Sequence, residues 1–212
     1  MPEDTTDLLL LNPVHEWDHM RGPENPPFTL VEYGDYQCPD CGRLFGTLES
    51  VQQEFGTRLR LVYRHYPLSG VHKHAQMAAE AAEAAAAQGR FWEMHDLLFG
   101  NQDALEQKHL LRYAEQLELD VDRFRRELKQ ESHLERVRQD FIAGVQNGVN
   151  GTPGLFLNGV RQPGVFDQPA LIALLNSVPS QAKSSRAVAI RLAIFVIPSG
   201  KVTRRMASSS GA

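Results

Sequence analysis

Cysteine is scarce in this chain, since its 212 residues include only two. Two cysteines cannot build a disulfide framework or a four-cysteine zinc site. A basic excess is also lacking, because 22 Lys and Arg stand against 26 Asp and Glu, and a net charge of −4 offers no basic field for nucleic acid. Long apolar runs are absent too: the segment 187–197 is short and is interrupted by Arg191. We therefore predict a globular protein with neither a nucleic-acid partner nor a membrane partner.

The amino terminus has little that resembles an export signal. It reads MPEDTTDLLLLNPVHEWDH, which begins with acidic residues and contains an apolar run of only four leucines. A secretory signal needs a positively charged start and a longer apolar stretch. The sequence thus predicts a cytoplasmic location.

Both cysteines fall in one short stretch, residues 34–42, which reads GDYQCPDCG. The preceding residues 28–33 are apolar and have the character of a buried strand. Apolar residues then recur at helical spacing from Leu44 to Phe55, and Gly56 is a natural stop. The pattern predicts a strand, a short loop and a helix, with the cysteines at the start of that helix.

This placement predicts different roles for the two thiols. Unpaired N–H groups and the helix dipole favour a thiolate at Cys38, which makes it the attacking nucleophile. Cys41, one turn further in, is placed to resolve the mixed disulfide. Pro39 suits the first helical position, where its missing N–H costs nothing. The carboxylate of Asp40 opposes a nearby thiolate, so we expect the thiolate to be only moderately stabilised and the disulfide to be a weaker oxidant.

Two other interpretations of the cysteine pair remain open at this point. The spacing could be accidental, or the pair could supply half of a zinc site. His72 and His74 are the nearest histidine pair, but their spacing is not the usual finger pattern. Redox chemistry is favoured over metal binding because a strand-loop-helix setting is the one that activates a thiol.

The rest of the chain predicts an α/β protein with a thioredoxin fold and an inserted all-helical domain. A second strand is expected at 59–65, and two more at 154–159 and 160–165, joined by the hairpin signal Asn158-Gly159. Helices are predicted at 74–88, 91–99, 104–117, 121–130, 134–146 and 168–176. Asp120 is expected to cap the helix at 121–130, and Val137, Phe141 and Val145 are expected on one face of the helix at 134–146. We expect an N-terminal extension (1–27), a thioredoxin-fold domain (28–68 and 148–178), a helical insertion (69–147) and a disordered tail (179–212), which has six basic residues and no acidic one.

Three ordered motifs resemble the DsbA-like branch of the thioredoxin superfamily. They are the segment from Glu32 to Cys41, the segment FWEMHDLLF at 91–99, and GTPGLFLNG at 151–159. The resemblance covers about Pro13 to Val178. It implies a thiol-disulfide oxidoreductase without a cofactor.

The resemblance also implies roles for particular residues. Cys38 matches the attacking cysteine and Cys41 the resolving one. Thr152 and Pro153 match a dipeptide whose proline is cis and packs against the disulfide, with the preceding residue tuning redox behaviour. Glu32 matches a buried acid that relays a proton to the resolving cysteine; an exposed or salt-bridged strand residue is the alternative.

Two departures from the family pattern bear on the direction of the reaction. The dipeptide between the cysteines is Pro-Asp instead of Pro-His, and no export signal is visible. Both favour reduction, isomerisation or redox sensing over the introduction of disulfides. The expected partners are cysteine-containing proteins or small thiols, together with an electron donor or acceptor. A glutathione-dependent isomerase is a further alternative, although such relatives commonly carry Ser in place of the attacking cysteine.

Overall fold

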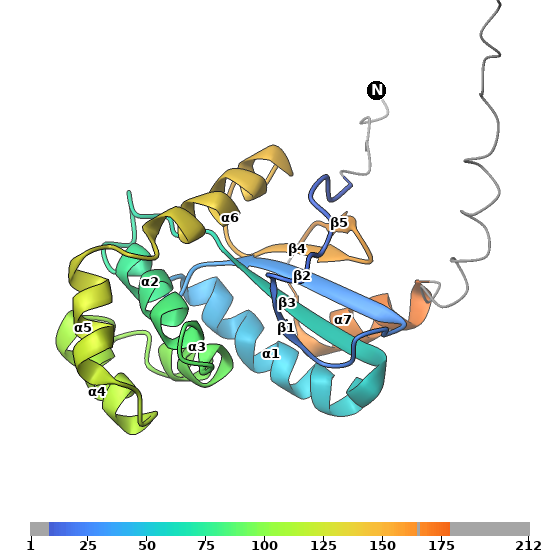
Figure 1. Cartoon of the computed structure of the whole chain (residues 1–212). Helices are drawn as coiled ribbons and strands as arrows, with labels where there is room; N and C mark the ends of the chain where they lie inside the picture. The colour runs from blue at the N-terminus through green and yellow to red at the C-terminus, as the bar shows by residue number, and fades with distance from the viewer. Residues whose placement is uncertain (1–8, 165, 179–212) are drawn as a thin grey trace, which may run out of the picture.

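The computed structural model describes residues 9–164 and 166–178, and Figure 1 shows one mixed sheet with helices around it. The sheet has the strand order β1-β3-β2-β4-β5. Its strands are β1 (His19–Arg21), β2 (Phe28–Gly34), β3 (Leu59–His65), β4 (Gly154–Leu157) and β5 (Val160–Gln162). β2 and β3 are parallel, and the other neighbours are antiparallel. The α/β thioredoxin fold is confirmed, while the expected tail, 179–212, lies outside the described residues.

The helices fall close to their predicted positions. They are α1 (Pro39–Phe55), α2 (Ala75–Ala86), α3 (Phe91–Gly100), α4 (Gln107–Gln116), α5 (Val121–Lys129), α6 (Leu134–Gln146) and α7 (Gln168–Ser177). Five of them, α2 to α6, follow one another between β3 and β4, and α2 to α5 gather beside the sheet (Figure 1). The prediction placed the start of α4 three residues too early, because Ala104 is held in a turn by its bond to the carbonyl of Asn101.

Helix α1 and helix α7 cover one face of the sheet. Leu44, Leu48, Val51 and Phe55 recur on one side of α1 and are all buried there. Burying an aliphatic or aromatic side chain of this size stabilises the fold by roughly 1.5–3 kcal/mol. Gly56 ends the helix with a positive φ of 51°, a backbone conformation that glycine adopts without strain.

The other face of the sheet is covered by α6, and here one prediction is wrong. Val137, Phe141 and Val145 were expected to share one apolar side. Val137 is buried and Phe141 packs against the cluster, but Val145 is 53% exposed. Positions four apart drift by about 40° around a helix, so two such steps turn Val145 away from the sheet. Gly144 is buried in its place.

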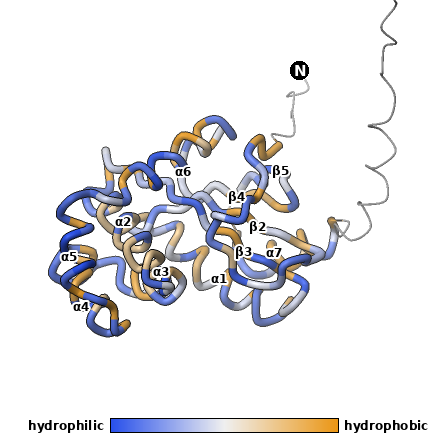
Figure 2. The backbone as a smooth tube through the Cα atoms, viewed as in Figure 1, coloured by the Kyte–Doolittle hydropathy of each residue, from blue (hydrophilic) through white to orange (hydrophobic). Residues whose placement is uncertain are grey.

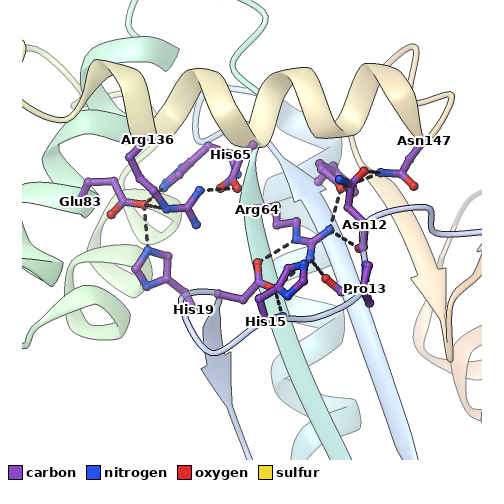
Figure 3. Close-up of polar contacts among 12 residues, drawn as sticks. Asn12, Pro13, His15, His19, Arg64, His65, Glu83, Arg136 and Asn147 are labelled. Carbon is purple, nitrogen blue, oxygen red and sulfur yellow. Dashed lines mark hydrogen bonds and ion pairs between the residues drawn. The ribbon is translucent and has the colours of Figure 1, made fainter.

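The short strand β1 escaped sequence analysis because three residues carry no periodicity. A buried guanidinium anchors the segment that leads into it (Figure 3). Arg64 on β3 donates to both carboxylate oxygens of Asp18 at 2.8 Å, and to the carbonyls of Asn12 and Pro13 at 3.0 and 2.8 Å. Removing one partner of such a buried ion pair would leave an uncompensated charge.

The helices combine apolar and polar faces. Figure 2 shows hydrophobic and hydrophilic stretches alternating along the helical part of the chain. Amphipathic helices of this kind bury one side and expose the other. Within residues 9–164 and 166–178, no helix has the length and apolar character needed to cross a membrane.

Candidate active site

The two cysteines occupy the start of α1. Cys38 is the N-cap residue, with an extended backbone, and Pro39 is the first helical residue. Both thiols are free and buried, with Cys41 fully buried. The strand-loop-helix setting predicted from the sequence is therefore correct. It turns the unpaired N–H groups of the helix start toward Cys38.

The surroundings separate the pKa values of the two thiols. A hydrogen bond from the Cys41 thiol is the largest influence on Cys38, whose pKa is lowered to about 6. Burial opposes this shift, while the side chain of Thr152 and the Cys41 backbone add to it. Burial raises the pKa of Cys41, and its hydrogen bond to Cys38 raises it further. At neutral pH Cys38 is thus a thiolate and Cys41 a thiol.

The Thr152–Pro153 dipeptide lies directly beside Cys38. Its peptide bond is cis, as the family resemblance implies. The sulfur of Cys38 is 3.4 Å from the carbonyl oxygen of Thr152. The sheet produces this approach, because Gly154 at the start of β4 pairs with Tyr33 near the end of β2.

Glu32 lies on β2 with only 5% of its surface exposed. Burial raises the pKa of this carboxyl to about 8, and the negative charge of Cys38 adds to the shift. The alternative of an exposed strand residue is therefore wrong. A carboxyl with a pKa near neutrality can accept and return a proton at physiological pH.

Asp35 is a site residue that the sequence analysis missed. Its buried carboxylate accepts hydrogen bonds from the backbone of Gln37 at 2.7 Å, the backbone of Leu68 at 2.8 Å, and His72 Nδ1 at 2.8 Å. Asp35 also acts on Cys38, whose pKa its charge raises. The available signal was its position inside the cysteine-containing stretch.

Asp40, for which we predict a tuning effect on Cys38, stands in a different environment from Asp35. Its side chain is exposed and forms an ion pair with Arg43 on the next turn of α1. Solvent and Arg43 both screen its charge. The carboxylate that most clearly opposes the Cys38 thiolate is therefore Asp35, and the tuning role of Asp40 remains a prediction.

Gln102, also missed by the sequence analysis, ties the helical region to the start of α1. Its amide nitrogen donates to the carbonyls of Tyr36 at 3.0 Å and Cys38 at 2.8 Å. This approach needs Gly42, because a Cβ there would lie 2.1 Å from the Gln102 side-chain oxygen. The loop after α3 thus fixes the backbone around the attacking cysteine.

One of the two histidines proposed for a zinc site is engaged elsewhere. His72 is paired with Asp35. In the described part of the chain, the one group of three potential metal ligands is His19, His65 and Glu83, whose donor atoms lie within 4.8 Å of one another. Both imidazoles already contact the same oxygen of Glu83, and the guanidinium of Arg136 lies 3.8 Å from it (Figure 3). Neither cysteine belongs to this group.

These features define a thioredoxin-fold protein with a thiol pair at a helix start and a cis-proline beside it. Residues 29–176 match the family model of the DSBA-like thioredoxin domain, and the chain belongs to that family. A thioredoxin-like oxidoreductase from Silicibacter pomeroyi is similar in structure, with a TM-score of 0.68 and 26% identity over 84% of this chain and 98% of that one. BdbD from Bacillus subtilis shares the fold, with a TM-score of 0.68 and 21% identity over 75% of this chain and 91% of that one.

Two curated relatives are much larger than this chain. It is 49% identical to the Na(+)/H(+) antiporter NhaA 3 of Salinispora tropica over 182 residues, which is 85% of this chain but 28% of the antiporter. It is 43% identical to the Na(+)/H(+) antiporter NhaA 1 of Mycolicibacterium gilvum over 179 residues, or 83% of this chain and 29% of that protein. The chain thus spans less than a third of these antiporters.

Proposed function

We propose that this chain is a thiol-disulfide oxidoreductase in which Cys38 attacks and Cys41 resolves. The observation that carries the proposal is the opposed shift of the two thiols: the pKa of Cys38 is lowered to about 6, and that of Cys41 is raised. A thiolate is the attacking species in disulfide exchange, and a buried thiol held next to it is the resolving group.

The reaction would proceed in two exchanges. The Cys38 thiolate attacks one sulfur of a substrate disulfide, and the other substrate sulfur leaves as a thiolate. Cys41 then loses its proton to Glu32 and attacks Cys38, which releases the second substrate sulfur and forms the Cys38–Cys41 disulfide. The substrate gains two electrons and the enzyme loses two. The reverse sequence would oxidise a dithiol substrate.

A substrate segment would bind beside the Thr152–Pro153 loop. A cavity of about 250 Å³ adjoins this loop and is lined in part by Asp40, Arg43 and Phe166. This cavity offers a substrate the apolar ring of Phe166, the ion pair of Asp40 with Arg43, and the backbone of the Thr152–Pro153 loop. An extended peptide that pairs backbone to backbone would be recognised with little dependence on sequence, which suits varied cysteine-containing proteins.

Two serine variants test this assignment. Cys38→Ser should abolish reduction of insulin disulfides by dithiothreitol-coupled turnover, because the attacking thiolate is lost. Cys41→Ser should still attack but should accumulate a mixed disulfide through Cys38, detected by mass spectrometry of the trapped adduct. Unchanged turnover in Cys38→Ser would overturn the assignment.

We further propose a Na(+)/H(+) antiporter as a partner of this domain. The support is the 49% identity to one segment of the Salinispora tropica antiporter. In that arrangement the thiol pair would make transport depend on redox state. The test is to replace the matching segment of that antiporter with this chain and to measure Na⁺-driven proton movement in vesicles with Cys38 and Cys41 reduced or oxidised. Equal transport in both states would contradict this partnership.

A further inference from the structure

Two buried oxygen atoms from neighbouring strands border one small space at the centre of the sheet. Glu32 on β2 and Tyr63 on β3 are paired positions of the parallel ladder, and both side chains are buried. A Cβ on Gly34 would lie 2.9 Å from the Glu32 carboxylate oxygen Oε1 and 2.9 Å from the Tyr63 hydroxyl. The two oxygens therefore border the same small space, which the lack of a side chain at position 34 leaves open.

Neither oxygen has a hydrogen-bond partner among the protein atoms. Glu32 Oε1 and the Tyr63 hydroxyl both belong to the buried polar atoms without one. A buried polar group left in that state is unfavourable, so an acceptor and a donor beside one space point to a hydrogen bond between them, direct or through water. The two groups are complementary, since a carboxylate accepts and a phenol donates.

A cavity provides room for the bridging molecule. Glu32 and Tyr63 both line a cavity of about 20 Å³, which is enough for roughly one water molecule. Polar side chains from β1, α1 and α3 also line it: Arg21, Glu49, Gln52 and His95.

We propose that Tyr63 is a positioning residue for Glu32: its hydroxyl, directly or through one water molecule in this cavity, donates to the carboxylate and orients it. This inference rests on the proposed thiol-disulfide exchange. The Cys41 S–H bond breaks, its proton passes to a Glu32 oxygen, and the freed thiolate attacks the mixed disulfide.

The groups around Glu32 show why a neutral side chain is the one that donates a hydrogen bond to its carboxylate. Cys38, Cys41 and Tyr36 interact with the charge of Glu32. Four groups line the same cavity, namely Arg21 of β1, Glu49 of α1, His95 of α3 and Tyr63 of β3, while β4 places the apolar Leu155 opposite Glu32. Arg21 is held by Asp96 at 2.7 Å. Burial lowers the pKa of His95 far below its usual range, so its imidazole is neutral.

Tyr63 is suited to donate without adding charge. Burial raises the pKa of Tyr63 well above its ordinary value, so the hydroxyl keeps its proton at every pH where the enzyme would act. A lysine in its place would hold Glu32 ionised. The phenol instead orients the carboxyl and leaves the pKa of Glu32 high, at about 8, where it can exchange protons.

The experiment is a titration of the Glu32 side-chain carboxyl by carbon NMR, with Glu32→Gln identifying the signal. Tyr63→Phe keeps the ring and removes the donor, so the midpoint of Glu32 should rise by about 0.5 to 1 pH unit. Tyr63→Lys should lower it by about 1 unit or more. Tyr113→Phe is the matched control, because it removes the hydroxyl that Tyr113 donates to the Ala104 carbonyl in the helical region, and it should leave the midpoint unchanged.

An unchanged Glu32 midpoint in Tyr63→Phe, or an equal shift in Tyr113→Phe, would overturn the proposal. Gly34→Ala gives a second test, because its Cβ would push the two oxygens apart and should also raise the midpoint. The titration needs no turnover, so its result is independent of the serine variants. Full exchange activity in Cys38→Ser, together with a shifted Glu32 midpoint in Tyr63→Phe, would overturn the proposed thiol-disulfide exchange. The hydrogen bond between Tyr63 and Glu32 would still be supported.

Discussion

The sulfur of Cys38 lies 3.4 Å from the carbonyl oxygen of Thr152, although 114 positions separate the two residues in the chain. The antiparallel pairing of β2 with β4 creates this contact, because it brings the loop that follows the end of β2 next to the residues that precede the start of β4. The helices inserted between β3 and β4 therefore do not disturb the approach of Thr152 to Cys38. Their contribution enters through Gln102, which bonds the carbonyl of Cys38.

Replacing Thr152 by Val should raise the pKa of Cys38. The substitution keeps the branched shape and removes the Thr152 hydroxyl, whose interaction with Cys38 lowers this pKa. The expected rise is about 0.5 to 1 unit, the equivalent of one hydrogen bond. The measurement is the pH dependence of iodoacetamide alkylation. Thr47→Val is the control, because it removes a hydroxyl that donates to the Arg43 carbonyl on the exposed side of α1. This variant should leave the pKa of Cys38 unchanged.

Replacing Asp40 by His should lower the pKa of Cys38 and make the disulfide more oxidising. The change removes a negative charge two residues from the thiolate. Because Asp40 is exposed and paired with Arg43, we expect only a few tenths of a pH unit and roughly 10 mV. Equilibration with glutathione measures the potential, and Asp122→His on α5 is the distant control. A shift toward a more reducing potential would refute the electrostatic argument.

Glu32 should make the protein less stable as the pH rises. Its pKa is about 8 when folded and near the ordinary glutamate value when unfolded, so the folded state binds the extra proton between these values. The free energy of unfolding should therefore fall from about pH 4.5 to pH 8. Glu32→Gln should be more stable than the native chain at pH 9, by on the order of a few kcal/mol, and similar to it at pH 4.5.

Urea unfolding at both pH values measures this difference. Glu49→Gln, which changes an exposed carboxyl of α1, is the control and should show no pH-dependent gain. A constant difference between Glu32→Gln and the native chain across this range would contradict a raised pKa at Glu32.

Replacing Gly144 by Ala should destabilise the packing of α6 on the sheet. A Cβ at this position would lie 2.6 Å from the ring of Tyr66, whose hydroxyl is held by the Val149 carbonyl at 2.7 Å. Overpacking of this kind costs about 1–3 kcal/mol. Gly46→Ala in α1 meets no atom within 4 Å and should instead stabilise by about 0.5–1 kcal/mol. Thermal unfolding of the two variants compares them directly.

Local signals in the sequence predicted the elements that place the thiol pair. Helical spacing identified α1 with its stop at Gly56, and the hairpin signal at Asn158-Gly159 is confirmed by positive φ values of 50° and 84°. The cap at Asp120 is also confirmed, since its side chain accepts from the backbone of Arg123. These features depend on neighbouring residues alone, so the sequence carries them in full.

Contacts between distant segments were beyond such reasoning. Asp35 gains its role from a loop more than thirty residues away, where it accepts from the backbone of Leu68 and from His72. The burial of Glu32 depends on what packs on both faces of β2, which periodicity does not reveal. The catalytic roles, the domain boundaries and the cytoplasmic location stay predictions.

The measurement that tests the central claim most directly is the alkylation rate of Cys38 in the reduced protein as a function of pH. The account predicts a midpoint near pH 6, and a higher midpoint in Cys41→Ala, because the Cys41 thiol is the largest influence that lowers this pKa. A Cys38 midpoint near 8.5, that of a free cysteine, with no change in Cys41→Ala, would contradict the account.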